Sequence, residues 1–339
     1  MRPRDLPRLG RQSGSAVVRR ARNELDWLAS RRGGADLALF HEFEPAPSGG
    51  GHQFLRALVG ELERRGLRVE HNRLSGGTSA CLFNSFNFDF GRLRRFARDD
   101  CRMVHRVDGP IGAYRGFDDG TDARIAAINA ELADVTVLQS AYSVQKHVEL
   151  GLELRATVAI SNTVDPSLFH PPGAREPLGD RRLRVIASSW SQNPGKGADV
   201  LAWLDEYLDP ARFRLTFVGQ AARRFRRIVH VGPLDSHGVA RILGEHDVYL
   251  AASRDDPCSN ALLEALACGL PAAYLASGGH PELVGKGGLP FTSPEEVPDV
   301  LERLAADLDA YRACIVVPTL ESVADRYLDA LGLAGGSRP

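Results

Sequence analysis

One stretch of the chain combines two acids with a helix start and few other charges. In SRDDPCSNALLEALACGLPAAY (253–274), Asp256 stands in a loop, Ser259 and Asn260 are good helix N-caps, and Glu264 is the last carboxylate. A helix that begins where a strand ends presents free backbone N–H groups and a partial positive charge, which suit a phosphate. The stretch therefore predicts an anion-binding helix start.

Glu264 is expected one turn into that helix, on the same face as Asn260. The helix is apolar on nearly every side, so we expect it to be buried, and a lone buried carboxylate needs a partner. A pair of vicinal ribose hydroxyls is one such partner, because an ionised carboxylate accepts two hydrogen bonds. The alternative is that Glu264 faces solvent or pairs with an internal arginine.

A glycine-rich turn also suggests binding chemistry. PSGGGHQ (47–53) joins the first predicted strand to the first predicted helix, and Gly50 and Gly51 would let a backbone approach a phosphate or sugar closely. A plain tight turn is the alternative. The segment is not the G-x-G-x-x-G of a dinucleotide fold, which disfavours a dehydrogenase.

A further strand end carries polar side chains. HRVDGP (105–110) is expected to place His105, Arg106 and Asp108 at the lip of a cleft, although a histidine that only caps the strand is the alternative. A metal-dependent enzyme of the kind that uses Asp-x-Asp at a strand end would need that motif, and here it occurs only at 307–309, in a predicted C-terminal helix. We therefore predict no metal ion and no cofactor.

The elements that must position these residues follow a repeating pattern. Short β-branched runs alternate with helical patterns, which indicates βα units on parallel sheets. A segment rich in proline and glycine, 164–180, divides the pattern into two series, so two doubly wound domains facing a cleft are predicted. The predicted strands are 36–43, 67–72, 80–85, 102–107, 135–140, 157–162, 183–189, 214–219, 227–232, 247–253, 270–276 and 288–292, and the predicted helices are 52–65, 121–133, 197–208, 236–245 and 259–268.

Composition sets broad limits. A chain of 339 residues exceeds one ordinary core, and 43% hydrophobic and 25% charged residues are typical of a soluble globular protein. A net charge of -1 argues against a nucleic-acid partner, and five cysteines without a C-x-x-C pair predict neither a disulfide framework nor a zinc site. With no apolar run long enough to span a membrane, a cytoplasmic location is expected.

The C-terminal motifs resemble a known family. The order acid, seven residues, acid from Asp256 to Glu264, followed by EALACGLP and SGGHPELV, resembles the E-x7-E region of glycosyltransferase family 4, whose members have the GT-B fold. NTVDPSLFHP (162–171) is similar to the interdomain junction of that family, and GKG (195–197) to its K-G segment. The resemblance covers roughly residues 35–332 in layout and is more specific in the C-terminal half.

The resemblance implies roles for the acids and for one histidine. In the family the second acid holds the ribose of a nucleotide sugar, which assigns the ribose to Glu264, and the first acid touches hydroxyls of the transferred sugar, which assigns the sugar to Asp256. The first acid is usually Glu, whose side chain is one methylene longer. Family members often carry a histidine near the sugar at the strand end where His105 stands.

The diphosphate is held in the family by a lysine and an arginine. Lys196 matches the lysine, but Trp190 or Ser191 occupies the place of the arginine. Arg254 or an arginine of RRFRR (223–227) is a possible substitute.

These roles predict a retaining, metal-independent, hexosyltransferase-like enzyme. It would move a sugar from a nucleotide diphosphate sugar to an unidentified acceptor (a glycan, a lipid-linked molecule or a small molecule), with polysaccharide biosynthesis as the expected setting. Lys196 and the helix start at Ser259 and Asn260 would stabilise the leaving diphosphate. The alternatives are a GT-B-fold sugar-nucleotide epimerase or phosphorylase, and a non-catalytic nucleotide-sugar-binding protein.

The expected domain organisation follows from the same reasoning. Residues 1–34 form a basic extension, whose interleaved apolar residues suggest contact with an anionic membrane surface, a solvated extension being the alternative. Residues 35–163 form an acceptor-side Rossmann-like domain and 164–180 the linker. Residues 181–318 form the Rossmann-like domain for the nucleotide sugar, and 319–339 a helix and tail that pack back on the N-terminal domain.

Overall fold

A computed structural model gives the structure of the protein. It describes residue 25 and residues 33–43, 50–85, 88–191, 193–221 and 223–334. The predicted basic extension and its membrane contact lie almost wholly outside the described residues, and so does most of the glycine-rich turn before residue 50.

The first domain is built on a parallel sheet with strand order β2-β1-β3-β4-β5-β6. Neighbouring residues of β1 point to opposite faces, Leu37 and Leu39 into a core with α2 and Ala38 and Phe40 into a core with α3. The strands are β1 (Leu37–Phe40), β2 (Val69–His71), β3 (Ala80–Asn84), β4 (Arg102–Arg106), β5 (Val135–Leu138) and β6 (Thr157–Ala159), and the helices are α2 (Gly50–Arg64), α3 (Phe90–Phe96), α4 (Ile111–Arg115), α5 (Thr121–Leu132) and α6 (Ala141–Glu149).

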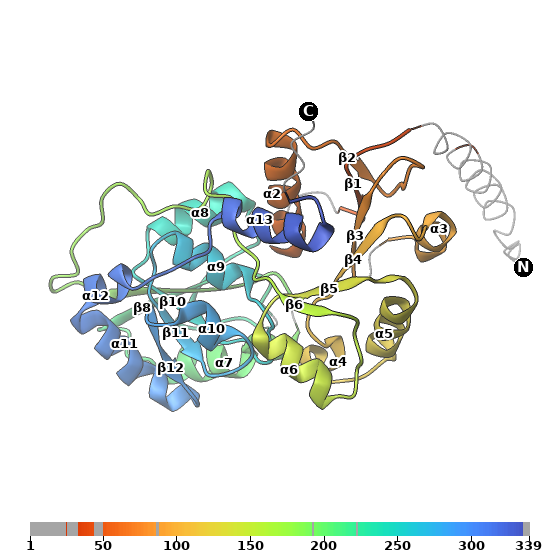
Figure 1. Ribbon diagram of the computed structural model, residues 1–339. Helices are drawn as coiled ribbons and strands as arrows, with labels where there is room; N and C mark the ends of the chain where they lie inside the picture. Colours follow the sequence, from red (N-terminus) through yellow and green to blue (C-terminus); the bar gives the residue numbers. More distant parts are fainter. Residues whose placement is uncertain are drawn as a thin grey trace, which may run out of the picture.

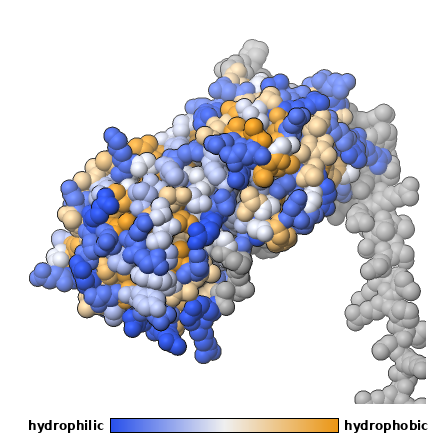
Figure 2. Space-filling model, turned by 90° about the horizontal axis from the view of Figure 1, so that it is seen from below, coloured by the Kyte–Doolittle hydropathy of each residue, from blue (hydrophilic) through white to orange (hydrophobic). Residues whose placement is uncertain are grey.

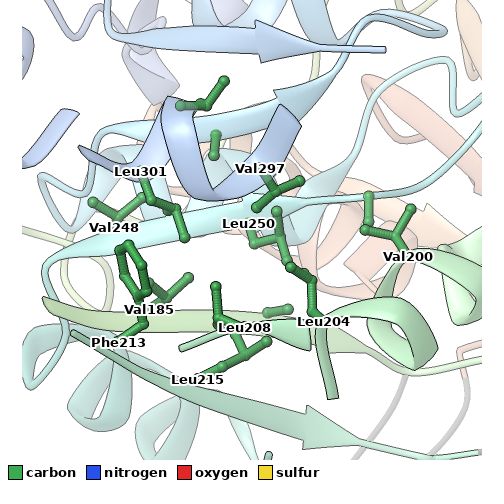
Figure 3. Packing of buried hydrophobic residues seen from close by; sticks show 14 of the residues in the cluster. Val185, Val200, Leu204, Leu208, Phe213, Leu215, Val248, Leu250, Val297 and Leu301 are labelled. Carbon is green, nitrogen blue, oxygen red and sulfur yellow. The ribbon is translucent and has the colours of Figure 1, made fainter. Parts of the chain in front are cut away.

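The second domain repeats the arrangement with strand order β12-β11-β10-β7-β8-β9, again parallel. Its larger core packs β7, β8 and β10 against α7 and α11, as Figure 3 shows for Val185, Leu204 and Leu301. The strands are β7 (Leu183–Ser189), β8 (Phe213–Gly219), β9 (Val229–Val231), β10 (Val248–Ala251), β11 (Ala272–Leu275) and β12 (Gly288–Phe291), and the helices are η1 (Pro194–Lys196), α7 (Ala198–Tyr207), α8 (Ser236–Gly244), α9 (Asn260–Ala267), α10 (His280–Val284), η2 (Pro294–Glu296), α11 (Val297–Ala306) and α12 (Leu308–Ala313).

The last helix, α13 (Leu320–Leu331), returns to the first domain, where it lies beside α2 (Figure 1). Val323, Ala324 and Tyr327 of this helix belong to the core that also contains Phe54 of α2. The hydroxyl of Thr163, at the end of the first domain, donates a hydrogen bond to the Pro318 carbonyl oxygen at 2.5 Å. The chain therefore crosses between the domains twice.

Every predicted strand coincides with an observed one, but one helix prediction was wrong. The Asp-x-Asp at 307–309 does not lie inside a single helix, because Asp307 ends α11 and its side chain caps α12 by accepting a hydrogen bond from the Ala310 amide. An aspartate there marks a helix start, which favours a short polar side chain. All five cysteines are free thiols, so the absence of a disulfide framework is confirmed.

The surface gives two further facts. The face seen in Figure 2, from the side of α4 and α6 in Figure 1, is mostly hydrophilic with smaller hydrophobic areas between. Within the described part of the chain, no helix combines the length and apolar character needed to cross a membrane.

Candidate functional site

A cavity of about 290 Å³ lies between the carboxyl ends of the second sheet and the first domain. It is lined by the ends of β7, β8 and β10 and by the start of α9, with Gly50 and Tyr114 on the opposite side. An adjoining cavity of about 650 Å³ shares Gly50, Asn260 and Glu264 with it. This is the place where doubly wound sheets bind ligands.

The start of α9 faces this cavity. Ser259 is the N-cap, and its hydroxyl accepts a hydrogen bond from the Leu262 amide at 3.4 Å. The Asn260 side-chain oxygen accepts a hydrogen bond from the Asn162 amide group at 3.0 Å, which ties the helix start to the junction between the domains. The first amides of a helix have no backbone partner within the helix, so those that the Ser259 cap does not take are available to an anion in the cavity.

Gly50 is needed for a close approach between two helices. A Cβ atom on Gly50 would lie only 2.4 Å from the Cβ of Asn260, so α2 can begin against α9 only with glycine at this position. A Cβ on Gly51 would meet no atom within 4 Å. The structure thus explains Gly50 by helix contact, and the space beside Gly51 leaves its predicted approach to a phosphate or sugar as a prediction.

Glu264 lies one turn further along α9 and lines both cavities. Burial raises the pKa of its carboxyl group to about 8, and no described residue forms a hydrogen bond or an ion pair with it. The alternative of pairing with an internal arginine is therefore not found in the described part of the chain. A carboxyl group without a protein partner in a cavity is well suited to a ligand that brings hydroxyl groups.

Lys196 and Asp256 form an ion pair across the floor of the cavity. The Lys196 Nζ lies 2.7 Å from the Asp256 Oδ2. Burial opposes the charge of both groups, but their mutual attraction outweighs it, so the pKa of Asp256 is lowered and that of Lys196 is raised. An ammonium group has three donors, so Lys196 keeps donors for a further acceptor.

Three further residues lie beside this pair. The Lys196 Nζ lies 4.7 Å from the centre of the Tyr114 ring, a cation–π contact that crosses from one domain to the other. The Ser253 hydroxyl lies 3.4 Å from the Asp256 Oδ2 and 3.0 Å from the His280 Nε2. His280 is the histidine of SGGHPELV, so that motif already carried a signal in the sequence.

The arginines that were considered as diphosphate-binding residues differ in the contacts that they make. The Arg254 guanidinium forms an ion pair with Asp199 and does not line the cavity. The backbone amides of Arg226 and Arg227 are bound by the buried Asp205 carboxylate, and the Arg227 guanidinium donates to the Glu206 carbonyl oxygen.

Arg223 differs from these arginines. It lines a small recess together with Ser189, Ser191 and Lys196, and this recess adjoins the main cavity. No acid of the described residues forms an ion pair within 4 Å of the Arg223 side chain, although its charge acts on the buried Asp205 carboxylate. Trp190 and Ser191, which stand where the sequence resemblance would place an arginine, line the main cavity themselves.

His105 is not at the lip of the cleft, contrary to the prediction. Its side chain is fully buried in the sheet, stacked on the Phe83 ring at 4.3 Å between centroids and 3.1 Å from the Asn129 amide nitrogen. Burial lowers the pKa of His105 to about 3. His105 is not the last residue of β4, which runs on to Arg106. Its side chain therefore still belongs to the strand and points into the protein interior.

Asp108 follows the end of β4 but does not line either cavity. Its carboxylate pairs with the buried Arg106 guanidinium at 3.0 Å. Arg106 also donates to the side chains of Asn84, at 2.7 Å, and Asn162, at 3.0 Å. Since Asn162 in turn donates to Asn260, a polar chain links this part of the first domain to the start of α9.

Six of the predicted site residues are therefore brought together on one cavity, namely Gly50, Lys196, Asp256, Ser259, Asn260 and Glu264. His105, Asp108 and Gly51 are not among its lining residues. In the described part of the chain, no three His, Cys, Asp or Glu side chains gather as a group that could hold a metal ion.

Comparison with known proteins agrees with this geometry. Residues 186–307 match the family model of glycosyl transferases group 1. Three solved structures are similar in fold: HepE from Anabaena, in complex with UDP and glucose (15% identity, TM-score 0.63, 88% of this chain and 99% of that chain), a glycosyltransferase from Rickettsia africae (12%, 0.61, 89% and 99%) and sucrose-phosphate synthase from Thermosynechococcus elongatus (17%, 0.55, 85% and 76%). No curated protein matches the chain in sequence.

The matched region begins in β7 and ends after α11, so it contains the lysine loop, the acidic loop and α9. The described chain thus has the two-domain GT-B fold of known glycosyltransferases, and its second domain carries the match to glycosyl transferases group 1.

Proposed function

We propose that the protein is a retaining, metal-independent glycosyltransferase that uses a nucleotide diphosphate sugar. The observation that carries the proposal is Glu264, a carboxyl group without a protein partner among the described residues, on a helix whose start faces the same cavity. A ribose diol would supply the two hydroxyl donors that this group lacks. The solved HepE structures hold UDP and UDP-glucose, which makes UDP-glucose the first donor to test.

In this proposal the diphosphate lies between the start of α9 and two cations. Lys196 provides one charge, and Arg223 takes the place of the arginine that the family has before its lysine. Arg223 lines the recess that Lys196 also lines, while Arg254 is already paired with Asp199. Because Asp256 neutralises part of the Lys196 charge, a second cation is needed to balance the leaving diphosphate.

Asp256 is the acid that we assign to the transferred sugar. Its carboxylate is held by Lys196 and lies beside Ser253, so both residues help to orient it. Closure of the two domains would exclude water and hold an acceptor hydroxyl against the sugar carbon. The acceptor hydroxyl would attack the sugar carbon from the face on which the diphosphate departs. The configuration at that carbon is then retained, and no protein nucleophile is needed.

The test begins with binding of UDP, GDP and ADP, measured by calorimetry, to the full chain and to Glu264→Ala. We expect one of the nucleotides to bind and the Glu264→Ala variant to bind it roughly tenfold or more weakly, the range for one or two hydrogen bonds to a charged group. A folded variant with unchanged affinity for that nucleotide contradicts the ribose assignment.

The same measurement separates the arginines. Arg223→Ala should weaken diphosphate binding several-fold, whereas Arg224→Ala should not, because both arginines are exposed but only Arg223 lines the recess. Equal effects would mean that the segment acts only through general charge. Release of nucleoside diphosphate from the matching sugar nucleotide, in the presence of EDTA, distinguishes a metal-independent enzyme from a binding protein, and the stereochemistry of the product distinguishes retention from epimerisation.

A further inference from the structure

A contact between the two domains lies directly beside Asp256 and has no role in the proposal above. Tyr142, in the first turn of α6, donates its hydroxyl to the Asp255 Oδ1 at 2.7 Å. Its backbone amide and that of Ala141 donate to the two Glu282 carboxylate oxygens at 2.7 and 2.8 Å. The second domain thus holds the start of α6 both by the backbone and by the Tyr142 side chain.

Asp255 has an unusual backbone. Its φ is 51°, in the left-handed region that residues other than glycine rarely adopt. Aspartate tolerates this region better than most residues, but the conformation still costs free energy unless surrounding contacts maintain it. The Asp255 amide donates to the Ser277 hydroxyl at 2.9 Å, so Ser277 supplies one such contact and Tyr142 another.

The backbone turn at Asp255 sets the direction of Asp256. The Asp256 carbonyl oxygen accepts a hydrogen bond from the Gly279 amide at 2.9 Å. A Cβ on Gly278 would lie 2.3 Å from that same oxygen, so only glycine fits there. Segment 277–279 therefore contacts the turn from within the second domain, and Tyr142 contacts it from the first domain.

We propose that Tyr142 and Asp255 are positioning residues that couple the approach of the two domains to the orientation of Asp256. The proposal rests on the proposed function, because Asp256 is there the acid that contacts the transferred sugar. When the domains separate, Asp255 loses the Tyr142 hydroxyl and the turn loses one of its supports. The sugar-contacting acid then becomes fully ordered only when the first domain, which carries the acceptor side, is in place.

Four variants test this. Tyr142→Phe removes only the hydroxyl, and Tyr207→Phe, on an exposed tyrosine of α7, is the matched control. Asp255→Asn keeps both an acceptor oxygen and a residue that tolerates a positive φ, so it should retain most of the activity. Asp255→Gly keeps the turn without an acceptor, which separates the backbone conformation from the contact between the domains.

The first measurement is hydrogen exchange of the ligand-free protein. Tyr142→Phe and Asp255→Gly should speed amide exchange in 253–258 and 277–280, with Asp255→Asn and Tyr207→Phe close to the unchanged protein. Unaltered exchange in Tyr142→Phe overturns the inference, whatever the substrate proves to be, because this measurement does not depend on the donor.

The second measurement uses the sugar nucleotide selected by the binding test. Tyr142→Phe and Asp255→Gly should lower turnover by about 10- to 100-fold, the range for losing one hydrogen bond to a charged group, while the dissociation constant of the nucleoside diphosphate changes less than about threefold. Equal losses in binding and turnover would indicate a general structural defect and overturn the positioning role. If the unchanged protein binds no nucleotide, the proposed function fails, and the exchange measurement alone decides the inference.

Discussion

At the scale of single residues, Glu264 is a side chain whose chemistry is strongly altered by its surroundings. Burial without a protein partner raises the pKa of its carboxyl group from 4.5 to about 8. The folded protein therefore holds a proton on Glu264 at neutral pH, whereas the unfolded chain does not. A ligand that stabilises the ionised carboxylate must displace this proton. The buried carboxyl group costs free energy in the ligand-free protein, and binding of such a ligand offsets that cost.

This cost predicts a pH-dependent stability. Because the folded pKa is raised above the unfolded value, the contribution of Glu264 to stability is fully present below about pH 4.5 and is lost as the pH rises through about 8. Glu264→Gln should therefore be close to the unchanged protein near pH 4.5 and exceed it in free energy of unfolding at pH 8.5 by up to about 4–5 kcal/mol, since one unit of pKa difference corresponds to about 1.4 kcal/mol. Urea unfolding at several pH values measures this difference. A gain that is the same at both pH values would show that ionisation of Glu264 is not its cause.

At the scale of secondary-structure elements, the contact between the starts of α2 and α9 fixes the width of the cleft. Gly50 lies against Asn260, which lines both cavities and is hydrogen-bonded to Asn162. The N-terminus of one helix thus supports the N-terminus of another, and the anion-binding end of α9 is held by the first domain as well as by its own sheet.

Two neighbouring glycines provide a test at this scale. Gly50→Ala would place a methyl group 2.4 Å from the Asn260 Cβ, so α2 or α9 must shift, at a cost of about 1–3 kcal/mol. Gly51→Ala meets nothing within 4 Å and should be neutral or stabilise α2 by up to about 1 kcal/mol. The thermal denaturation midpoint should therefore fall in Gly50→Ala and should rise or stay unchanged in Gly51→Ala. Similar losses for both would show that the contact with Asn260 is not the reason for glycine.

At the scale of the whole molecule, α13 fastens the end of the chain to the first domain. Its buried Tyr327 ring lies 5.9 Å from the Phe54 ring of α2, between centroids, and Arg65, just after α2, pairs with Asp325 at 2.5 Å. The first domain therefore completes its core with a helix that follows the second domain in sequence. The two domains cannot be separated by cutting the linker alone without removing part of this core.

Tyr327→Ala should consequently destabilise the first domain by about 3 kcal/mol, the usual cost of removing a fully buried aromatic ring. Tyr207→Ala, on a side chain that is 59% exposed, is the control and should cost less than about 1 kcal/mol. Limited proteolysis should cleave the Tyr327→Ala variant first in the first domain. Cleavage that begins in the second domain would contradict the assignment of α13 to the first core.

The sequence by itself determined the strands, part of the helices and the acidic helix start of the site, whereas α3, α6 and α11 were not predicted. β-branched runs and their helical partners predict every observed strand, because the alternation of side chains along a strand is a local property. Ser259 as a helix start and Glu264 as a lone carboxylate on an apolar helix were likewise readable, since capping and spacing along a helix depend on neighbours within a few residues.

Only the tertiary structure decided which side chains meet. The Lys196–Asp256 pair joins residues 60 positions apart, and the Tyr142–Asp255 contact joins residues 113 positions apart, so no local pattern indicates either. His105 lies within β4, whose two faces are both covered, so only residues beyond the end of the strand could reach the cleft, and where the strand ends is decided by the tertiary structure. From the sequence, Gly50 was interpreted as a phosphate contact. In the structure, Asn260 of the other domain leaves no space for a Cβ at this position, a constraint that the local sequence does not reveal.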